Sequence, residues 1–260
     1  MARAKPRPPP TECSKMQPKR HTMRIPLGKG NDAQTLVLEY DPLAVYAPTA
    51  YSSVLLVRNI DVQPDDVALD LGTGSGVYAV GIALRGARRV VAVDIHESAL
   101  ETAQHNAELN DVSARIQFRR GSMFDPIGDD EKFSLIVSNP PCLPDPGDID
   151  LMIPGTIMLS GPDGAHHATV LLEQGPAHLL PEGRIVFVYP STSNPRKIFG
   201  LLDQHYEYDI LAEIDIPFYL HFLELWDYLR DLKAQDISEF HEKAGVPYRT
   251  YWLIEARPKP

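Results

Sequence analysis

Residues 67–78 read Val-Ala-Leu-Asp-Leu-Gly-Thr-Gly-Ser-Gly-Val-Tyr, and this stretch decides the fold. A short apolar run leads into three glycines that alternate with small residues, and an apolar-periodic segment follows from Val77. The pattern predicts a buried strand that turns sharply into a helix. Gly72, Gly74 and Gly76 let the backbone bend and let a ligand approach without meeting a Cβ atom, and we expect the N–H groups at the helix start to face that ligand.

A second buried strand is predicted at residues 89–94, and it ends in the carboxylate of Asp94. An acid at the tip of the second strand of a βαβ unit is placed to accept both hydroxyls of a ribose. We therefore expect a cofactor that contains a nucleoside. The glycines and this spacing alone also fit NAD, and a tight turn without any ligand gives the same pattern.

Longer motifs distinguish these alternatives. Asp70 precedes the first glycine, and Ser138-Asn139-Pro140-Pro141 stands at the end of a later predicted strand. Together, Asp-Leu-Gly-Thr-Gly-Ser-Gly, Val-Asp and Asn-Pro-Pro resemble the class I S-adenosylmethionine (SAM) methyltransferases. Within that superfamily the chain most resembles the HemK-like protein-glutamine N5-methyltransferases, which modify release factors, and residues 159–164 resemble a Gly-Gly-x-Asp-Gly segment of those enzymes.

This resemblance runs from about Tyr46 to the C-terminus and implies a fold. It implies an α/β, Rossmann-like sheet of seven mostly parallel strands with an antiparallel last strand and helices on both faces. The residue pattern agrees, because predicted strands and helices alternate along the chain. Predicted strands cover 35–40, 115–120, 133–138, 184–189, 208–215 and 248–256, and predicted helices cover 49–60, 98–110 and 194–204, with another from Ala165.

The resemblance also implies a set of SAM-binding residues. In class I methyltransferases an acid after the third strand accepts the adenine amino proton, and Asp125 resembles it, with Met123 or Phe124 beside the ring. A turn aspartate before Pro126 is the alternative explanation. The residues expected at the cofactor are Asp70, Gly72, Thr73, Gly74, Gly76, Asp94, Ile95, Met123, Phe124, Asp125 and Asn139.

Asn139 and Pro140 are the expected catalytic residues. An amide nitrogen is a poor nucleophile because its lone pair is delocalised. The Asn139 side-chain carbonyl and the Pro140 backbone carbonyl can accept hydrogen bonds from its two N–H groups and hold the lone pair toward the methyl group. The family usually carries an aromatic residue where this chain has Cys142, so stacking on a flat substrate is weaker and the pocket has more room. We expect Cys142 to line the pocket and not to act as a nucleophile.

Three segments are expected to supply further substrate contacts. In the family, the region matching residues 46–49 lies across the cofactor and the substrate pocket, although core packing explains a lone aromatic equally well. The acidic loop that begins at Asp145 is either solvated or selects a cationic substrate. A helical insertion at 217–247 is expected to form a substrate lid, on which Tyr219 or Trp226 replaces the missing ring. The expected substrate contacts are Tyr46, Thr49, Pro141, Cys142, Asp145, Tyr219 and Trp226.

Composition limits the partners. Residues 1–34 read as a disordered, basic, proline-rich arm ahead of a methyltransferase domain at 35–260. Residues 1–30 carry eight basic side chains against Glu12, so the net charge of −10 leaves the rest of the chain at about −17, which makes nucleic acid an unfavourable partner. No stretch approaches the roughly 20 apolar residues of a membrane span, and two cysteines in unlike contexts form no disulfide framework. We expect a cytoplasmic enzyme without a membrane partner.

No metal site is expected, because His166 and His167 point to different faces of a helix and make a poor ligand pair. The function expected first is SAM-dependent N-methylation of a small molecule or peptide, such as an amino acid amine or a guanidine in specialised metabolism. The alternative is N5-methylation of a release-factor glutamine; methylation of a nucleic-acid base and a non-catalytic SAM-binding protein rank lower. The acceptor, the number of methyl groups and the oligomeric state, including a homo-oligomer, stay open.

Overall fold

The computed structural model describes residues 20–28, 34–42, 45, 47–48, 51–147, 158–218 and 221–260. Strand β3 (Val67–Leu71) lies at the centre, parallel to β4 (Arg89–Asp94) on one side and to β6 (Phe133–Ser138) on the other. The side chains of these strands are buried on both faces along almost their whole length. This is the pattern of parallel strands that are covered by helices on both sides.

The main sheet has the strand order β5-β4-β3-β6-β7-β10-β8, and β9 pairs with β10 outside this order. The remaining strands are β5 (Ile116–Arg120), β7 (Leu179–Pro190), β8 (Tyr206–Pro217), β9 (His241–Lys243) and β10 (Val246–Pro258). Strand β10 runs antiparallel to both β7 and β8. The expected seven-stranded arrangement with an antiparallel last strand is therefore confirmed, with the short β9 as an addition.

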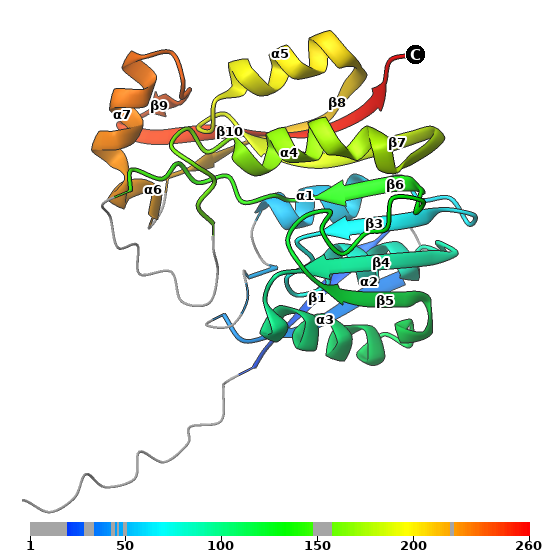
Figure 1. Cartoon of the computed structure of the whole chain (residues 1–260). Helices are drawn as coiled ribbons and strands as arrows, with labels where there is room; N and C mark the ends of the chain where they lie inside the picture. The colour runs from blue at the N-terminus through cyan, green and yellow to red at the C-terminus, as the bar shows by residue number, and fades with distance from the viewer. Residues whose placement is uncertain are drawn as a thin grey trace, which may run out of the picture.

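Helices cover both faces of this sheet (Figure 1). Helices α1 (Tyr51–Asn59), α2 (Val77–Leu84) and α3 (Glu97–Leu109) lie on one face, where α1 and α2 supply much of one apolar core. Helices α4 (His166–Gln174) and α5 (Pro195–His205) pack on the other face around a second core. Among the described helices, none is both long and apolar enough to cross a bilayer.

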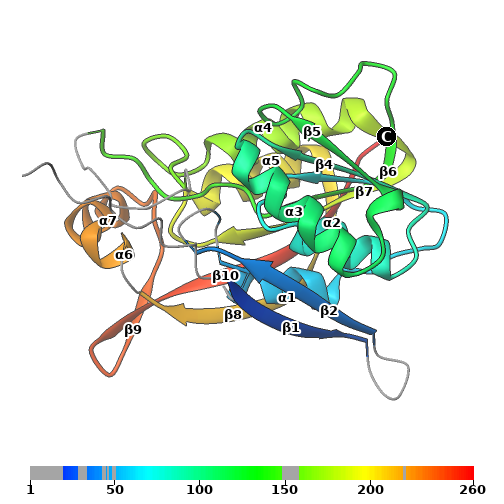
Figure 2. The ribbon, with the colours of Figure 1, turned by 90° about the horizontal axis from the view of Figure 1, so that it is seen from below.

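A two-stranded antiparallel hairpin precedes the main domain (Figure 2). It consists of β1 (His21–Leu27) and β2 (Gln34–Tyr40), so the expectation of a disordered arm as far as residue 34 is wrong for residues 21–27. The reason is a period-two apolar pattern in which Ile25 and Leu27 are buried against the core of α1 and α2. Residues 1–19 lie outside the described part of the chain.

The expected insertion at 217–247 contains α6 (His221–Glu224), α7 (Trp226–Ala234) and β9. It forms a small apolar core of its own, which also includes Leu143 from the loop after β6. Ser191, directly after β7, holds the insertion through two hydrogen bonds with the backbone of Glu239. The insertion is thereby attached to the carboxyl end of the sheet, as Figure 2 shows for α6 and α7.

Candidate active site

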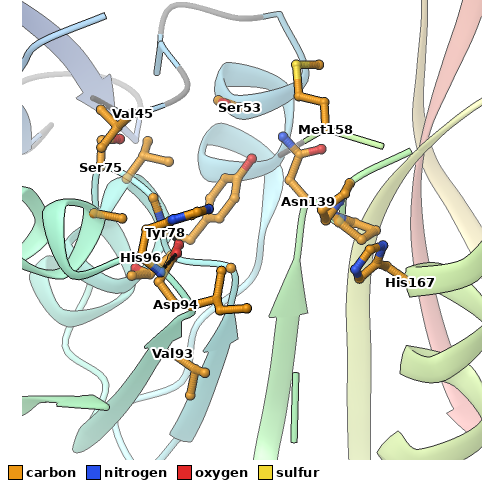
Figure 3. Close-up of a pocket in the computed structure, with 18 of the residues that line it drawn as sticks. Val45, Ser53, Ser75, Tyr78, Val93, Asp94, His96, Asn139, Met158 and His167 are labelled. Carbon is orange, nitrogen blue, oxygen red and sulfur yellow. Dashed lines mark hydrogen bonds between the residues drawn. The ribbon is translucent and has the colours of Figure 1, made fainter. Parts of the chain in front are cut away.

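The candidate site is a cavity at the carboxyl ends of β3, β4, β5 and β6, the edge where ligands of open α/β sheets bind (Figure 3). Each of these strands sends the loop that follows it into the cavity wall, which contains residues 72–75, 94–96, 121–123 and 139–142. Side chains from other parts of the chain complete the wall: Val45, Ser52, Ser53, Val77, Tyr78, Val93, Ala99, Met158, His167 and Tyr251.

The glycine loop is held by its own backbone amides. The N–H groups of Gly72 and Thr73 both donate to the carbonyl of Val93 at 2.9 Å, and that of Gly76 donates to Thr73 at 2.8 Å. The N–H of Ala79 in the first turn of α2 donates to Asp70 Oδ2 at 3.0 Å, so the expectation that the N–H groups at the helix start face a ligand is wrong for Ala79. Gly72 and Gly74 border open space, because a Cβ atom added at either would meet nothing within 4 Å. At Gly72 and Gly74 the loop therefore leaves room for a ligand to approach the backbone closely.

Gly76 has a different role from the other two glycines. Its φ is +79°, and an added Cβ would lie 3.0 Å from Ala103 of α3. It does not line the cavity. Gly76 therefore allows α2 and α3 to pack closely at the end of the loop.

Asp94 is fixed at the tip of β4. Its Oδ2 accepts the N–H of Gly74 and its Oδ1 accepts the N–H of His96, each at 2.9 Å. A carboxylate oxygen can accept more than one hydrogen bond, so both oxygens keep capacity for the hydroxyls of a ribose. Ile95 also lines the cavity and is half exposed, which leaves an apolar surface beside the carboxylate.

Asp70 lies beneath the loop and not in the cavity wall. Its Oδ2 accepts hydrogen bonds from the Thr73 hydroxyl at 2.7 Å and from the Ala79 N–H at 3.0 Å. Burial raises the pKa of this carboxyl to about 7. Its Oδ1 is buried and has no partner among the described residues. Asp70 therefore ties the glycine loop to the start of α2 from below.

The loop after β5 brings only part of the expected adenine contacts to the cavity. Met123 lines it, but Phe124 is buried and stacks on His178 with the ring centroids 5.0 Å apart. Asp125 is exposed and does not line the cavity, whereas Ser122 does. The cause is a turn, in which Met123 has a φ of +46° and the N–H of Asp125 donates to the Ser122 carbonyl at 2.9 Å.

Asn139 stands at the centre of the cavity wall, directly after β6 (Figure 3). Its Nδ2 donates to the Ser52 hydroxyl at 3.3 Å, which leaves Oδ1 as the acceptor of this amide. The buried Tyr78 hydroxyl lies beside Ser53 and Asn139, and burial raises the pKa of Tyr78 above its usual value. Ser52, Ser53 and Tyr78 were not predicted as site residues. Their sequence signal is weak, because a serine pair in a helix and a tyrosine near the start of a helix both occur without a function.

Cys142 lines the cavity together with Pro140 and Pro141. The thiol lies beside Tyr251 of β10, which also lines the cavity, and burial raises the pKa of Cys142 to about 11. The thiol therefore stays protonated near neutral pH, as expected for a residue that is no nucleophile. The aromatic ring beside Cys142 belongs to Tyr251, which lies outside the Asn139-Pro140-Pro141-Cys142 motif.

Other expected substrate contacts do not reach the cavity. Trp226 packs inside the insertion, with ring centroids 6.1 Å from Phe218 and 5.5 Å from Phe240, so it does not replace the missing ring. Asp145 lies outside the wall, and its Oδ1 accepts the N–H of Gly147 at 2.8 Å. Tyr46, Thr49 and Tyr219 lie outside the described residues. His167, considered from the sequence only as a poor metal ligand, does line the cavity.

Known proteins resemble this chain in sequence and in fold. The family model for the ribosomal protein L11 methyltransferases (PrmA) matches residues 46–144. A Methanocaldococcus jannaschii protein named for protein N5-glutamine methylation is 32% identical over 178 residues, which are 67% of this chain and 87% of the relative. The release factor glutamine methyltransferase of Aliivibrio fischeri is 37% identical over 122 residues, 44% of this chain and 42% of that enzyme.

Apart from the archaeal protein, the chain spans about half or less of the length of the first curated relatives that it matches. A solved structure, a T. thermophilus 16S rRNA methyltransferase in complex with AdoMet and guanosine, superimposes with a TM-score of 0.55. The match covers 93% of this chain and 50% of that structure at 18% sequence identity, so it supports the fold alone.

Proposed function

The chain belongs to the class I SAM-dependent methyltransferases, and from this premise we propose that it methylates the side-chain amide nitrogen of a glutamine in a protein substrate. The relatives at 32% and 37% identity that are named for this reaction support it. They favour a protein glutamine over the small-molecule nitrogen that the sequence pattern placed first. The observation that carries the proposal is Asn139 at the cavity wall next to Pro140, with its Nδ2 bonded to Ser52 and its Oδ1 left as an acceptor.

The residues of the cavity fit SAM. Asp94 would accept the ribose hydroxyls, and Ile95 and Met123 would cover the adenine. When bound, SAM would supply an electrophilic methyl group, carried on a positively charged sulfur that would keep the electron pair of the S–C bond, while the methylated nitrogen would give up one proton to solvent.

Asn139 and Pro140 prepare the acceptor nitrogen. Two carbonyl oxygens can accept from both N–H groups of a primary amide and so fix the direction of its lone pair. Positive charge develops on the nitrogen during transfer, and these two dipoles then bind it more strongly than in the ground state. Ser52 holds the Asn139 amide so that Oδ1, and not Nδ2, is presented to the acceptor.

We propose the insertion at 217–247 as the part that contacts the protein substrate. Its apolar core includes Leu143, and Met158 and Leu159 pack against it. Met158 also lines the cavity, so this side chain contacts both the core of the insertion and the space beside Asn139.

The test is methyl transfer from SAM to a Gly-Gly-Gln release-factor peptide, with Gly-Gly-Glu as the matched control. Fragment mass spectrometry is expected to place one methyl group on the glutamine side chain and none on the control. Free amino acids and guanidines are offered in parallel. Methylation of one of these compounds, with an unmodified peptide and an unmodified release factor, would overturn the proposal.

A further inference from the structure

His167 is held in a single orientation at the cavity wall. It is the second residue of α4, and Figure 3 shows its ring on the same side of the cavity as Asn139. Its Nδ1 lies 2.9 Å from the hydroxyl oxygen of Ser160, and its backbone N–H donates to the same oxygen at 3.0 Å. Ser160 is 1% exposed, so these contacts lie out of reach of water.

The contacts of Ser160 fix the tautomer of the ring. A backbone N–H can only donate, so the Ser160 oxygen accepts the bond from the His167 main chain. Within the described part of the chain, the other partner of this hydroxyl is Nδ1. The Ser160 hydroxyl can therefore donate its proton in a hydrogen bond only to Nδ1. Leaving a buried hydroxyl donor unpaired would cost free energy, so this arrangement is favoured. With Nδ1 as an acceptor, the neutral ring carries its proton on Nε2.

Neutrality of the ring is supported by its surroundings. Burial, together with the neighbouring His166, lowers the pKa of His167 below its usual value. The Nε2–H group has no partner among the described residues, and the ring lines the cavity. His167 thus presents a hydrogen-bond donor beside the two acceptors supplied by Asn139 and Pro140.

We propose that His167 Nε2–H donates a hydrogen bond to the carbonyl oxygen of the acceptor amide, and that Ser160 is the positioning residue that fixes this tautomer. The inference rests on the proposed function and deepens it. A primary amide has two N–H donors and one carbonyl acceptor, which match two acceptors and one donor in the wall. A guanidinium or ammonium group has no acceptor and would leave Nε2–H unpaired. The three contacts together select an amide over a cationic nitrogen.

The kinetic test compares His167→Ala with His166→Ala, the matched control, because His166 is the adjacent, exposed histidine outside the cavity wall. His167→Ala is expected to raise KM for the Gly-Gly-Gln peptide about 5- to 10-fold, the value of one hydrogen bond, with unchanged SAM affinity. His167→Gln, whose amide can also donate, is expected to recover most of this loss. A histidine acting as a base would not be replaced by glutamine, so a missing rescue contradicts the donor role.

The tautomer is tested by the ¹⁵N chemical shifts of the His167 ring in the full chain. We expect a protonated Nε2 and an unprotonated Nδ1, and in Ser160→Ala a mixture of both tautomers together with a raised peptide KM. A protonated Nδ1 in the unaltered protein would overturn the inference. If the unaltered protein methylates the peptide but His167→Ala behaves like His166→Ala, this inference fails while the proposed function stands. If no glutamine is methylated, the proposed function itself fails.

Discussion

Gly164 lies directly under the loop that carries Asn139, and its replacement by alanine tests whether the backbone of that loop sets the reaction geometry. Its φ is +75°, and an added Cβ would lie 2.5 Å from the Cys142 carbonyl oxygen and 2.9 Å from the Ser193 Cβ. The Ser193 hydroxyl donates to the same carbonyl. The substitution therefore pushes on the backbone at a point three residues after Asn139.

The magnitude follows from these distances. An L-residue in the left-handed conformation costs roughly 1–2 kcal/mol. Ordinary van der Waals contact begins at 3.4 Å, so the Cys142 carbonyl must retreat by about 0.9 Å. A displacement of about 1 Å at the reacting groups costs on the order of 100-fold in rate. We expect Gly164→Ala to lower kcat for the Gly-Gly-Gln peptide about 100-fold, with SAM affinity nearly unchanged because the glycine loop is not touched.

Gly245→Ala is the matched control, since Gly245 has a φ of +76° and an added Cβ there meets nothing within 4 Å. It carries the same backbone strain without the collision and lies in the turn between β9 and β10. Urea unfolding is expected to show a loss of roughly 1–2 kcal/mol for Gly245→Ala and a larger loss for Gly164→Ala. Equal kcat values for the two variants would refute the coupling of Gly164 to the reacting groups.

Three further predictions concern single carboxyl or thiol groups. Asp94→Ala is expected to weaken SAM binding, measured by calorimetry, about 10- to 100-fold, because charge-assisted hydrogen bonds are lost. The kcat at saturating SAM is expected to stay nearly unchanged, and an equal loss in kcat would contradict a binding role. Cys142→Ala is expected to keep activity. Iodoacetamide at pH 8 is expected to leave the unaltered enzyme active, because burial raises the pKa of the thiol to about 11. Rapid inactivation through Cys142 would instead show a reactive thiolate. The pKa of Asp70 is about 7 in the folded protein against 3.8 for a free group, so its contribution to the stability of the SAM-free protein is present below pH 4 and is lost as the pH rises through 7. Asp70→Asn is expected to flatten this dependence in urea titrations at pH 5 to 8, and an unchanged slope would contradict the assignment.

The central sheet and the core of the site were predictable because their signals are local. Strands buried on both faces read as continuous apolar runs. Asp94 ends β4 and Asn139 directly follows β6, so the two residues meet at one edge by the geometry of a parallel sheet. The hairpin strand β1 was missed although its alternating apolar pattern is visible, because the preceding proline-rich segment dominated the composition.

The rest of the cavity wall could not be predicted, because it depends on contacts between residues distant in sequence. Ser52, His167 and Tyr251 reach the cavity from three different elements, and none belongs to a local motif. The turn after β5 shows that the conformation of a short local segment can also escape prediction from the sequence. A positive φ at Met123 sends Phe124 into the core and leaves Ser122 at the cavity, and no propensity of these residues indicates that conformation.

The central claim is that Asn139 acts on the acceptor nitrogen and not on the cofactor. The measurement that tests it most directly is the methyl-transfer rate of Asn139→Ala on the Gly-Gly-Gln peptide, set beside its dissociation constant for SAM. We expect the rate to fall about 100- to 1,000-fold, as for the loss of a preorganised dipole, while SAM binding changes little. An equal weakening of SAM binding and rate, or an unchanged rate, would contradict the account.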